Sequence, residues 1–137
     1  MQFMMMMKCN KEYEAGRPPD PRLMAAIAKH SEAAMKAGIL LETGGLLPTS
    51  KGARLHVSGG KTNVIDGPFA ETKELIGGFA ILKAESKEDA IRLGKDFMQL
   101  HIDILGPAYE GLMEIRQMWD EEDVRAAVQE AAQVAHK

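Results

Sequence analysis

The sequence predicts an α+β fold of ferredoxin-like type, with an added β-hairpin and a C-terminal helix. Apolar segments of strand length alternate with two segments whose apolar residues recur every three or four positions. Their order is β-α-β, then a hairpin, then β-α-β and a final helix, which suits two helices packed on one antiparallel sheet. The 137 residues contain no long linker and no internal repeat, so we expect a single domain.

The composition excludes several other classes of protein. Hydrophobic residues make up 45% and charged residues 27% of the chain, values typical of a globular protein. The net charge of -3 gives no basic surface for nucleic acid, and no apolar run approaches the roughly 18–20 residues of a membrane helix. The lone cysteine, Cys9, excludes an internal disulfide and is typical of a reducing compartment, so we expect a cytoplasmic protein.

The chain begins with a strand and an amphipathic helix. Residues 1–8 are apolar on both strand faces, which indicates a central strand, and they lack the basic n-region and the cleavage site of a signal peptide. Asp20 followed by Pro21 predicts the start of a helix after a proline-rich loop. The stripe of that helix expected to face the core comprises Leu23, Ile27, His30 and Ala34.

The middle of the chain predicts a strand and a hairpin. The strand covers residues 39–47 and is stopped by the next residue, Pro48. Residues 54–58 and 61–65 are extended segments joined by Gly59-Gly60. Because glycine takes positive φ at both turn positions without steric cost, this pair predicts a tight β-hairpin.

The last third predicts a strand, a helix, a strand and a helix. Residues 77–84 form the first strand, and Ser86 with Asp89 matches a helix-capping box. The helix that follows carries an apolar stripe of Ala90, Leu93, Phe97 and Leu100. Residues 112–118 form the last strand, and Asp120 opens the terminal helix with Val124, Val128, Ala131 and Ala135 on one side.

Strand alternation predicts one apolar and one mixed sheet face. Met113 and Ile115 point to one side of the last strand, and Glu114 and Arg116 point to the other. Two helices cover one face, so the mixed face either meets solvent or lines a cleft closed by a second subunit. We expect a homodimer, because the mixed face also carries apolar side chains that a lone subunit would expose.

An unusual turn follows the hairpin. Asp66-Gly67-Pro68 predicts an abrupt turn, in which the Asp side chain can bond nearby amides and proline fixes φ. Phe69 can anchor the loop in the core. If Gly67 takes a positive φ, Gly67→Ala should destabilise the fold by about 1 kcal/mol or more.

Charged residues near this turn are candidate binding groups. Glu71, Lys73 and Glu74 place opposite charges close together on a constrained loop, where proton affinities shift. The alternative is that Glu71 and Lys73 pair with each other and hold the loop. Arg116 can bind a substrate carboxylate with two hydrogen bonds, or it can pair with Glu114.

Residues 66–74, together with Gly77-Gly78-Phe79, resemble the signature of the YCII-related family, also called DGPF-domain proteins. The resemblance covers roughly residues 1–119, which we take as the YCII-related α+β domain, with residues 120–137 as its C-terminal helical extension. It also includes the methionine-rich first strand, Gly38 and residues 114–116. The sequence departs from the family pattern at Gln117, where the family usually has proline.

The resemblance implies pairing as a dimeric α+β barrel, in which two sheets face each other around a cleft. It also implies a His–Asp catalytic pair, for which this chain offers His30 and Asp66. His30 would act as acid or base and Asp66 would orient it. The alternative is that His30 is a core histidine bonded to a backbone carbonyl.

By analogy with isomerases, dehalogenases and monooxygenases of the same superfamily, the resemblance favours a cofactor-independent enzyme. Its substrate would be a small polar or anionic molecule in the dimer cleft. The alternative is a non-catalytic module that binds a ligand or a regulator through the same surface. No phosphate-binding glycine motif is present, and His101 and His136 lack metal-ligand spacing, so we expect no cofactor and no structural zinc.

Overall fold

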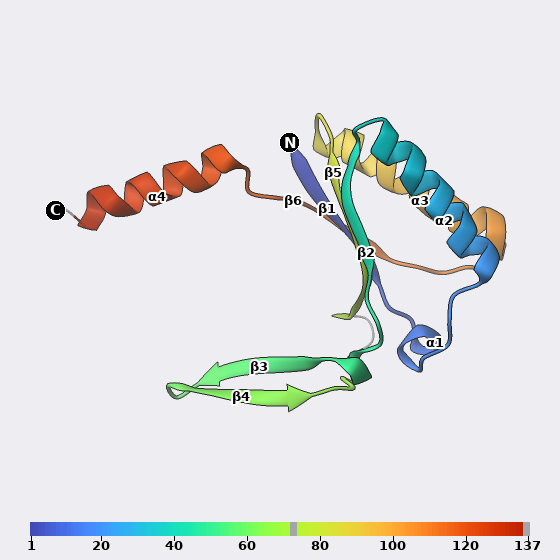
Figure 1. Ribbon diagram of the computed structural model, residues 1–137, viewed down its shortest axis with the longest axis horizontal. Helices are drawn as coiled ribbons and strands as arrows, with labels where there is room; N and C mark the ends of the chain where they lie inside the picture. Colours follow the sequence, from blue (N-terminus) through green and yellow to red (C-terminus); the bar gives the residue numbers. More distant parts are fainter. Residues whose placement is uncertain (72–73, 136–137) are drawn as a thin grey trace.

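The computed structural model describes residues 1–71 and 74–135 and shows the predicted α+β order (Figure 1). The sequence did not indicate two short elements, the helix α1 and the 3-10 turn η1. In chain order the elements are β1 (Gln2–Lys8), α1 (Lys11–Glu14), α2 (Pro21–Lys36), β2 (Leu40–Gly45), η1 (Thr49–Lys51), β3 (Ala53–Ser58), β4 (Lys61–Asp66), β5 (Ile76–Lys83), α3 (Lys87–Leu105), β6 (Met113–Gln117) and α4 (Glu121–Ala135).

Four strands form one antiparallel sheet in the order β2-β5-β1-β6. Numbered within the sheet in chain order and read from β6, this is 4-1-3-2, the ferredoxin-like arrangement that the sequence predicts. The methionine-rich strand β1 is central, since Met5 pairs with Ala80 of β5 on one side and Ile115 of β6 on the other. Strands β3 and β4 form a separate two-stranded hairpin.

Helices α2 and α3 lie on the same face of the sheet (Figure 1). Met113 and Ile115 pack toward these helices, as the alternation of β6 predicts. Helix α3 approaches β6 closely at Gly94, where an added Cβ would lie 3.0 Å from the Ile115 side chain. The buried core between the layers includes Phe3, Met5, Leu40, Leu82, Ala84 and Ala90.

The predicted capping residues and the hairpin turn are confirmed. Asp20 accepts a hydrogen bond from the Arg22 amide at 2.8 Å, and Ser86 accepts one from the Asp89 amide at 3.0 Å. The hairpin turn has positive φ at both glycines, +59° at Gly59 and +75° at Gly60.

The hairpin and α4 project from the sheet on the side opposite α2 and α3 (Figure 1). Every residue of β3, β4 and α4 is exposed in the single chain. Among residues 1–71 and 74–135, no helix combines the length and hydropathy needed to cross a membrane.

Candidate functional site

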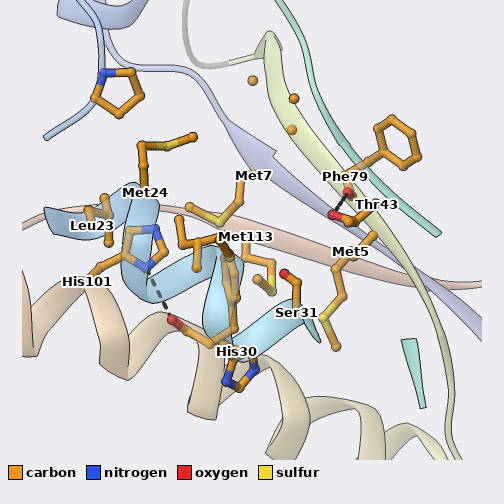
Figure 2. Close-up of a pocket in the computed structure, with 18 of the residues that line it drawn as sticks. Met5, Met7, Leu23, Met24, His30, Ser31, Thr43, Phe79, His101 and Met113 are labelled. Carbon is orange, nitrogen blue, oxygen red and sulfur yellow. Dashed lines mark hydrogen bonds between the residues drawn. The ribbon is translucent and has the colours of Figure 1, made fainter. Parts of the chain in front are cut away.

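A cavity of about 980 Å³ lies between the sheet and the pair of helices α2 and α3. The polar side chains that line it include those of His30, Ser31, Thr43 and His101. Most of the other side chains drawn around it are apolar (Figure 2). They include Met5, Met7, Leu23, Met24, Phe97 and Met113.

His101, on α3, is the most buried titratable group at this cavity, with 5% of its surface exposed. Its Nδ1 lies 3.1 Å from the carbonyl oxygen of Phe97, one helical turn earlier (Figure 2). A carbonyl can only accept, so Nδ1 donates, and Nε2 of the neutral ring carries a free lone pair. Burial lowers the pKa of His101, although the bond to the Phe97 carbonyl opposes this shift. The imidazole is therefore neutral at pH 7 and able to accept a proton.

An aromatic row forms the helix-side wall of the cavity. The Phe97 ring centroid lies 5.1 Å from that of His101 and 6.0 Å from that of His30. Tyr109 extends the row beyond His101, at 5.2 Å between centroids. In Figure 2, His30 lies near α3, whereas Thr43 lies on the opposite, sheet side of the cavity. A flat molecule over Phe97 would thus contact both imidazoles.

Every charged side chain among the described lining residues is already in an ion pair. The lining contains three cations and three carboxylates. The pairs are Lys8 with Glu114 (3.3 Å), Arg17 with Glu12 (3.4 Å), Arg22 with Asp20 (2.9 Å), and Arg92 with Asp89 (2.7 Å) and Asp96 (3.8 Å). The cavity therefore offers an ionic ligand no uncommitted opposite charge.

The structure of one chain does not bring His30 and Asp66 together. His30 is half-buried on α2, whereas Asp66 is exposed at the end of β4, in the projecting hairpin (Figure 1). Among the described residues, no hydrogen bond or ion pair reaches either side chain. The interpretation of His30 as a core histidine bonded to a carbonyl also finds no such bond within these residues.

The Asp-Gly-Pro-Phe turn is tied to two earlier segments of the chain. The Phe69 amide donates to the Thr49 hydroxyl at 3.0 Å, and the Gly67 amide donates to the Gly52 carbonyl at 3.0 Å. Thr49 in turn donates to the Glu14 carboxylate, through its amide at 2.7 Å and through its hydroxyl. The turn is thereby linked to η1 and, through Glu14, to α1.

The expectation of a positive φ at Gly67 is wrong, because Gly67 is not among the glycines with positive φ. Glycine is required there for space instead. A Cβ on Gly67 would lie 1.7 Å from the Thr49 carbonyl oxygen, far inside any tolerable contact.

Glu71, one of the charged residues of the loop, is paired with the hairpin. Glu71 accepts from the Arg54 guanidinium at 3.3 Å, so its partner is an arginine of β3. The guanidinium carbon of Arg54 lies 3.9 Å from the Phe69 ring centroid, a cation–π contact. Phe69 is half-buried against Arg54 rather than anchored in the core. Lys73 lies outside the described residues.

Arg116 lies on the sheet face that points away from the cavity. Its Nε is 3.7 Å from the Glu114 carboxylate, and 74% of its side chain is exposed. Glu114 also pairs with Lys8 at 3.3 Å. Of the two interpretations for Arg116, the contacts of the single chain are those of the structural ion pair.

The other reactive side chain near the cavity is Cys9. Burial raises the pKa of its thiol, and the nearby Glu14 carboxylate raises it further, so the thiol stays protonated at neutral pH. Within the described part of the chain, no three histidine, cysteine or acidic side chains are grouped so that they could hold a metal ion.

The sequence pattern of the YCII-related domain family matches residues 1–99. The chain belongs to the YCII-related domain family.

An uncharacterised protein of Rhizobium meliloti (strain 1021) is 38% identical to this YCII-related chain over 77 residues, 56% of the chain and 62% of that protein. The alignment thus spans less than two thirds of the relative's length. Among solved structures, the 5-chloro-2-hydroxyhydroquinone dehydrochlorinase of Burkholderia phenoliruptrix is 16% identical, with a TM-score of 0.39 over 90% of this chain and 99% of that one.

His101 was not among the site residues expected from the sequence of this YCII-related chain, where it was weighed only as a metal ligand. The signal was present in the helical spacing. His101 follows Phe97 by four residues and continues the buried stripe of Ala90 and Gly94. A histidine within an apolar stripe is a candidate for a desolvated imidazole.

Proposed function

We propose that this YCII-related domain binds a small, uncharged, largely apolar molecule in the helix–sheet cavity and acts on it by cofactor-independent acid–base chemistry. The observation that carries the proposal is the state of His101. Its Nδ1 is committed to the Phe97 carbonyl and the ring is almost fully buried, so Nε2 is a neutral base beside an apolar cavity.

The lining supports a neutral ligand rather than the polar or anionic molecule that the sequence suggested. Thioether and aromatic side chains favour apolar surface. The charged groups at the edge neutralise one another in ion pairs. The Thr43 hydroxyl donates to the Phe79 carbonyl at 2.9 Å and so remains able to accept a hydrogen bond from a ligand hydroxyl.

The proposed chemistry is a proton transfer within the bound molecule. His101 would take a proton from a hydroxyl group or from a carbon next to a carbonyl. The imidazolium of His101 formed in this way would return the proton to the same molecule at a second position, while His30, whose ring centroid lies 6.0 Å from that of Phe97, would contact the ligand. The apolar surroundings strengthen the electrostatic effect of each imidazole on the ligand.

The proposal is tested in two steps on the full chain. A thermal-shift screen compares neutral phenols and cyclic ketones with carboxylates of the same size. Binding at 100 times Kd should stabilise the fold by about 2.7 kcal/mol, and we expect this for neutral compounds alone. Carbon–hydrogen exchange of a bound ketone in D₂O, followed by NMR, then measures proton abstraction.

His101→Ala should abolish the exchange, while the matched histidine control, His56→Ala on the exposed hairpin, should leave it unchanged. Binding without exchange would leave the alternative, a non-catalytic ligand-binding module. One observation favours that alternative: among the described residues, no carboxylate contacts His101 to stabilise its protonated form. Stabilisation by carboxylates alone would contradict the proposed ligand class.

We also propose that the protein is a homodimer of the cytoplasm. Support for the dimer comes from the exposed apolar side chains on the hairpin, on α4 and at Leu112, which a second copy would cover. A single sedimenting species of monomer mass at micromolar concentration would exclude it. The lone, protonated thiol of Cys9 fits a reducing compartment.

A further inference from the structure

The two projecting elements each carry an exposed apolar face. On the hairpin, Leu55, Val57 and Val64 share one face, since Leu55 pairs directly with Val64. Their exposed fractions are 71%, 69% and 65%. On α4, Val124 and Val128 are one turn apart and likewise exposed. Within one chain nothing covers either face in the described ranges.

The two elements match in length and in direction. Helix α4 has 15 residues and spans roughly 22 Å at 1.5 Å per residue. Each hairpin strand has 6 residues and spans roughly 20 Å. Both extend from the sheet side opposite α2 and α3, beyond opposite ends of the strands (Figure 1). In one chain, α4 and the hairpin are therefore separated by the sheet face that α2 and α3 leave uncovered, here called the open face.

The charges of the two elements disfavour a contact between two copies of α4. Four carboxylates and one arginine lie within Glu121–Ala135, so two such helices would repel each other. The hairpin face that carries Leu55 has one charged side chain, Asp66 at its end, because Arg54 and Lys61 lie on the other face.

We propose that, in the homodimer, α4 of each copy packs lengthwise on the β3–β4 hairpin of the other. This inference rests on the dimer proposed above. Consider a two-fold axis that runs in front of the open face, perpendicular to the strands. It turns the second copy so that its open face meets that of the first, with the two ends of the sheet exchanged. Each α4 then meets the partner's hairpin, so the contact forms twice and closes the assembly. Val124 and Val128 would cover Leu55 and Val64.

Cross-linking between differently sized chains tests the contact. In a Cys9→Ala background, one tagged chain carries Val128→Cys and an untagged chain carries Leu55→Cys. The chains are mixed, exchanged and treated with a short bis-maleimide. We expect a mixed-chain product, which cannot arise within one chain.

The matched controls place cysteine on the opposite faces. Ala126→Cys lies about 160° around the helix from Val128, and Asn63→Cys lies on the other hairpin face from Leu55. Either control should lower the cross-linked product several-fold. Equal yields for both faces would overturn the inference.

Sedimentation of the same samples separates the two proposals. A dimer that gives no more product than the controls refutes the α4–hairpin contact and leaves the dimer standing. A monomer refutes both.

Trp119 offers a second measurement, because it is the only tryptophan in the sequence and 70% of its surface is exposed in one chain. If α4 docks on the partner's hairpin, Val128→Asp should shift the fluorescence emission of Trp119 to longer wavelength and weaken the dimer. Unchanged emission together with an unchanged sedimenting mass would contradict docking.

Discussion

The Asp-Gly-Pro-Phe turn gives the sharpest test of whether this loop acts through structure or chemistry. We predict that Gly67→Ala strongly destabilises the fold. A Cβ at this position lies 1.7 Å from the Thr49 carbonyl oxygen and must retreat to at least 3.0 Å. Because the carbonyl oxygen belongs to the backbone and the backbone also fixes the Cβ position, no side-chain rotation relieves the contact.

The loss of stability follows from the hydrogen bonds that weaken when the two backbone segments move apart. The hydrogen bonds from Gly67 to Gly52 and from Phe69 to Thr49 both span this interface, and each contributes about 0.5–1.5 kcal/mol. Steric overpacking adds about 1–3 kcal/mol, offset in part by the lower entropy of the unfolded alanine chain. We therefore expect a loss of about 2–4 kcal/mol, which for a chain of this size lowers Tm by roughly 10 °C.

Thermal melts of three variants decide the question. Gly52→Ala is the matched control, since its Cβ would meet the Thr49 carbonyl oxygen at an ordinary 3.6 Å and its φ of -122° suits any residue. Asp66→Asn changes an exposed carboxylate and should stay within about 0.5 kcal/mol of the parent. If Gly67→Ala melts together with Gly52→Ala, the steric reasoning is refuted. If Asp66→Asn keeps the melt but loses ligand response, Asp66 belongs to the site.

Two further predictions concern the cavity. The lowered pKa of His101 means that the unfolded chain takes up a proton near pH 6.5 before the folded chain does. Stability should be constant above about pH 7 and fall as the pH drops from about 6.5 through the folded-state pKa. His101→Phe should flatten this part of the Tm–pH profile, and an unaltered slope would assign the titration elsewhere. Ser31→Phe should fill part of the cavity, abolishing thermal shifts by neutral ligands while Tm itself changes by less than about 3 °C. Retained binding would place the ligand outside the cavity.

The sequence predicted those parts of the fold that depend on local signals. The N-caps at Asp20 and Ser86 and the Gly59-Gly60 turn each act over four residues or fewer, and all three are confirmed. Strand alternation also placed Met113 and Glu114 on opposite faces of the sheet, because the period of a strand is fixed by its backbone.

The parts that the sequence did not predict depend on contacts between distant segments. Thr49 bonds to Glu14 across 35 positions, and the Thr49 carbonyl occupies the space that a Cβ on Gly67 would need. Turn chemistry alone suggested a positive φ at Gly67, since a single segment gives no information about the neighbour that occupies the Cβ position. For His101, the helical spacing indicates the buried stripe, but its position at a cavity depends on how α2 and α3 pack against the sheet.

The position of the turn also bears on what the family resemblance can imply. Through Thr49 and Glu14 the turn holds α1, and Tyr13 of α1 lines the cavity while its hydroxyl donates to the Leu46 carbonyl. The turn can therefore influence the cavity by positioning one wall of it without contacting a ligand. A signature of this kind identifies a scaffold. The proposed acid–base chemistry depends on the side chains that α2 and α3 present to the cavity, so His101→Ala should remove proton transfer while leaving every contact of the turn intact.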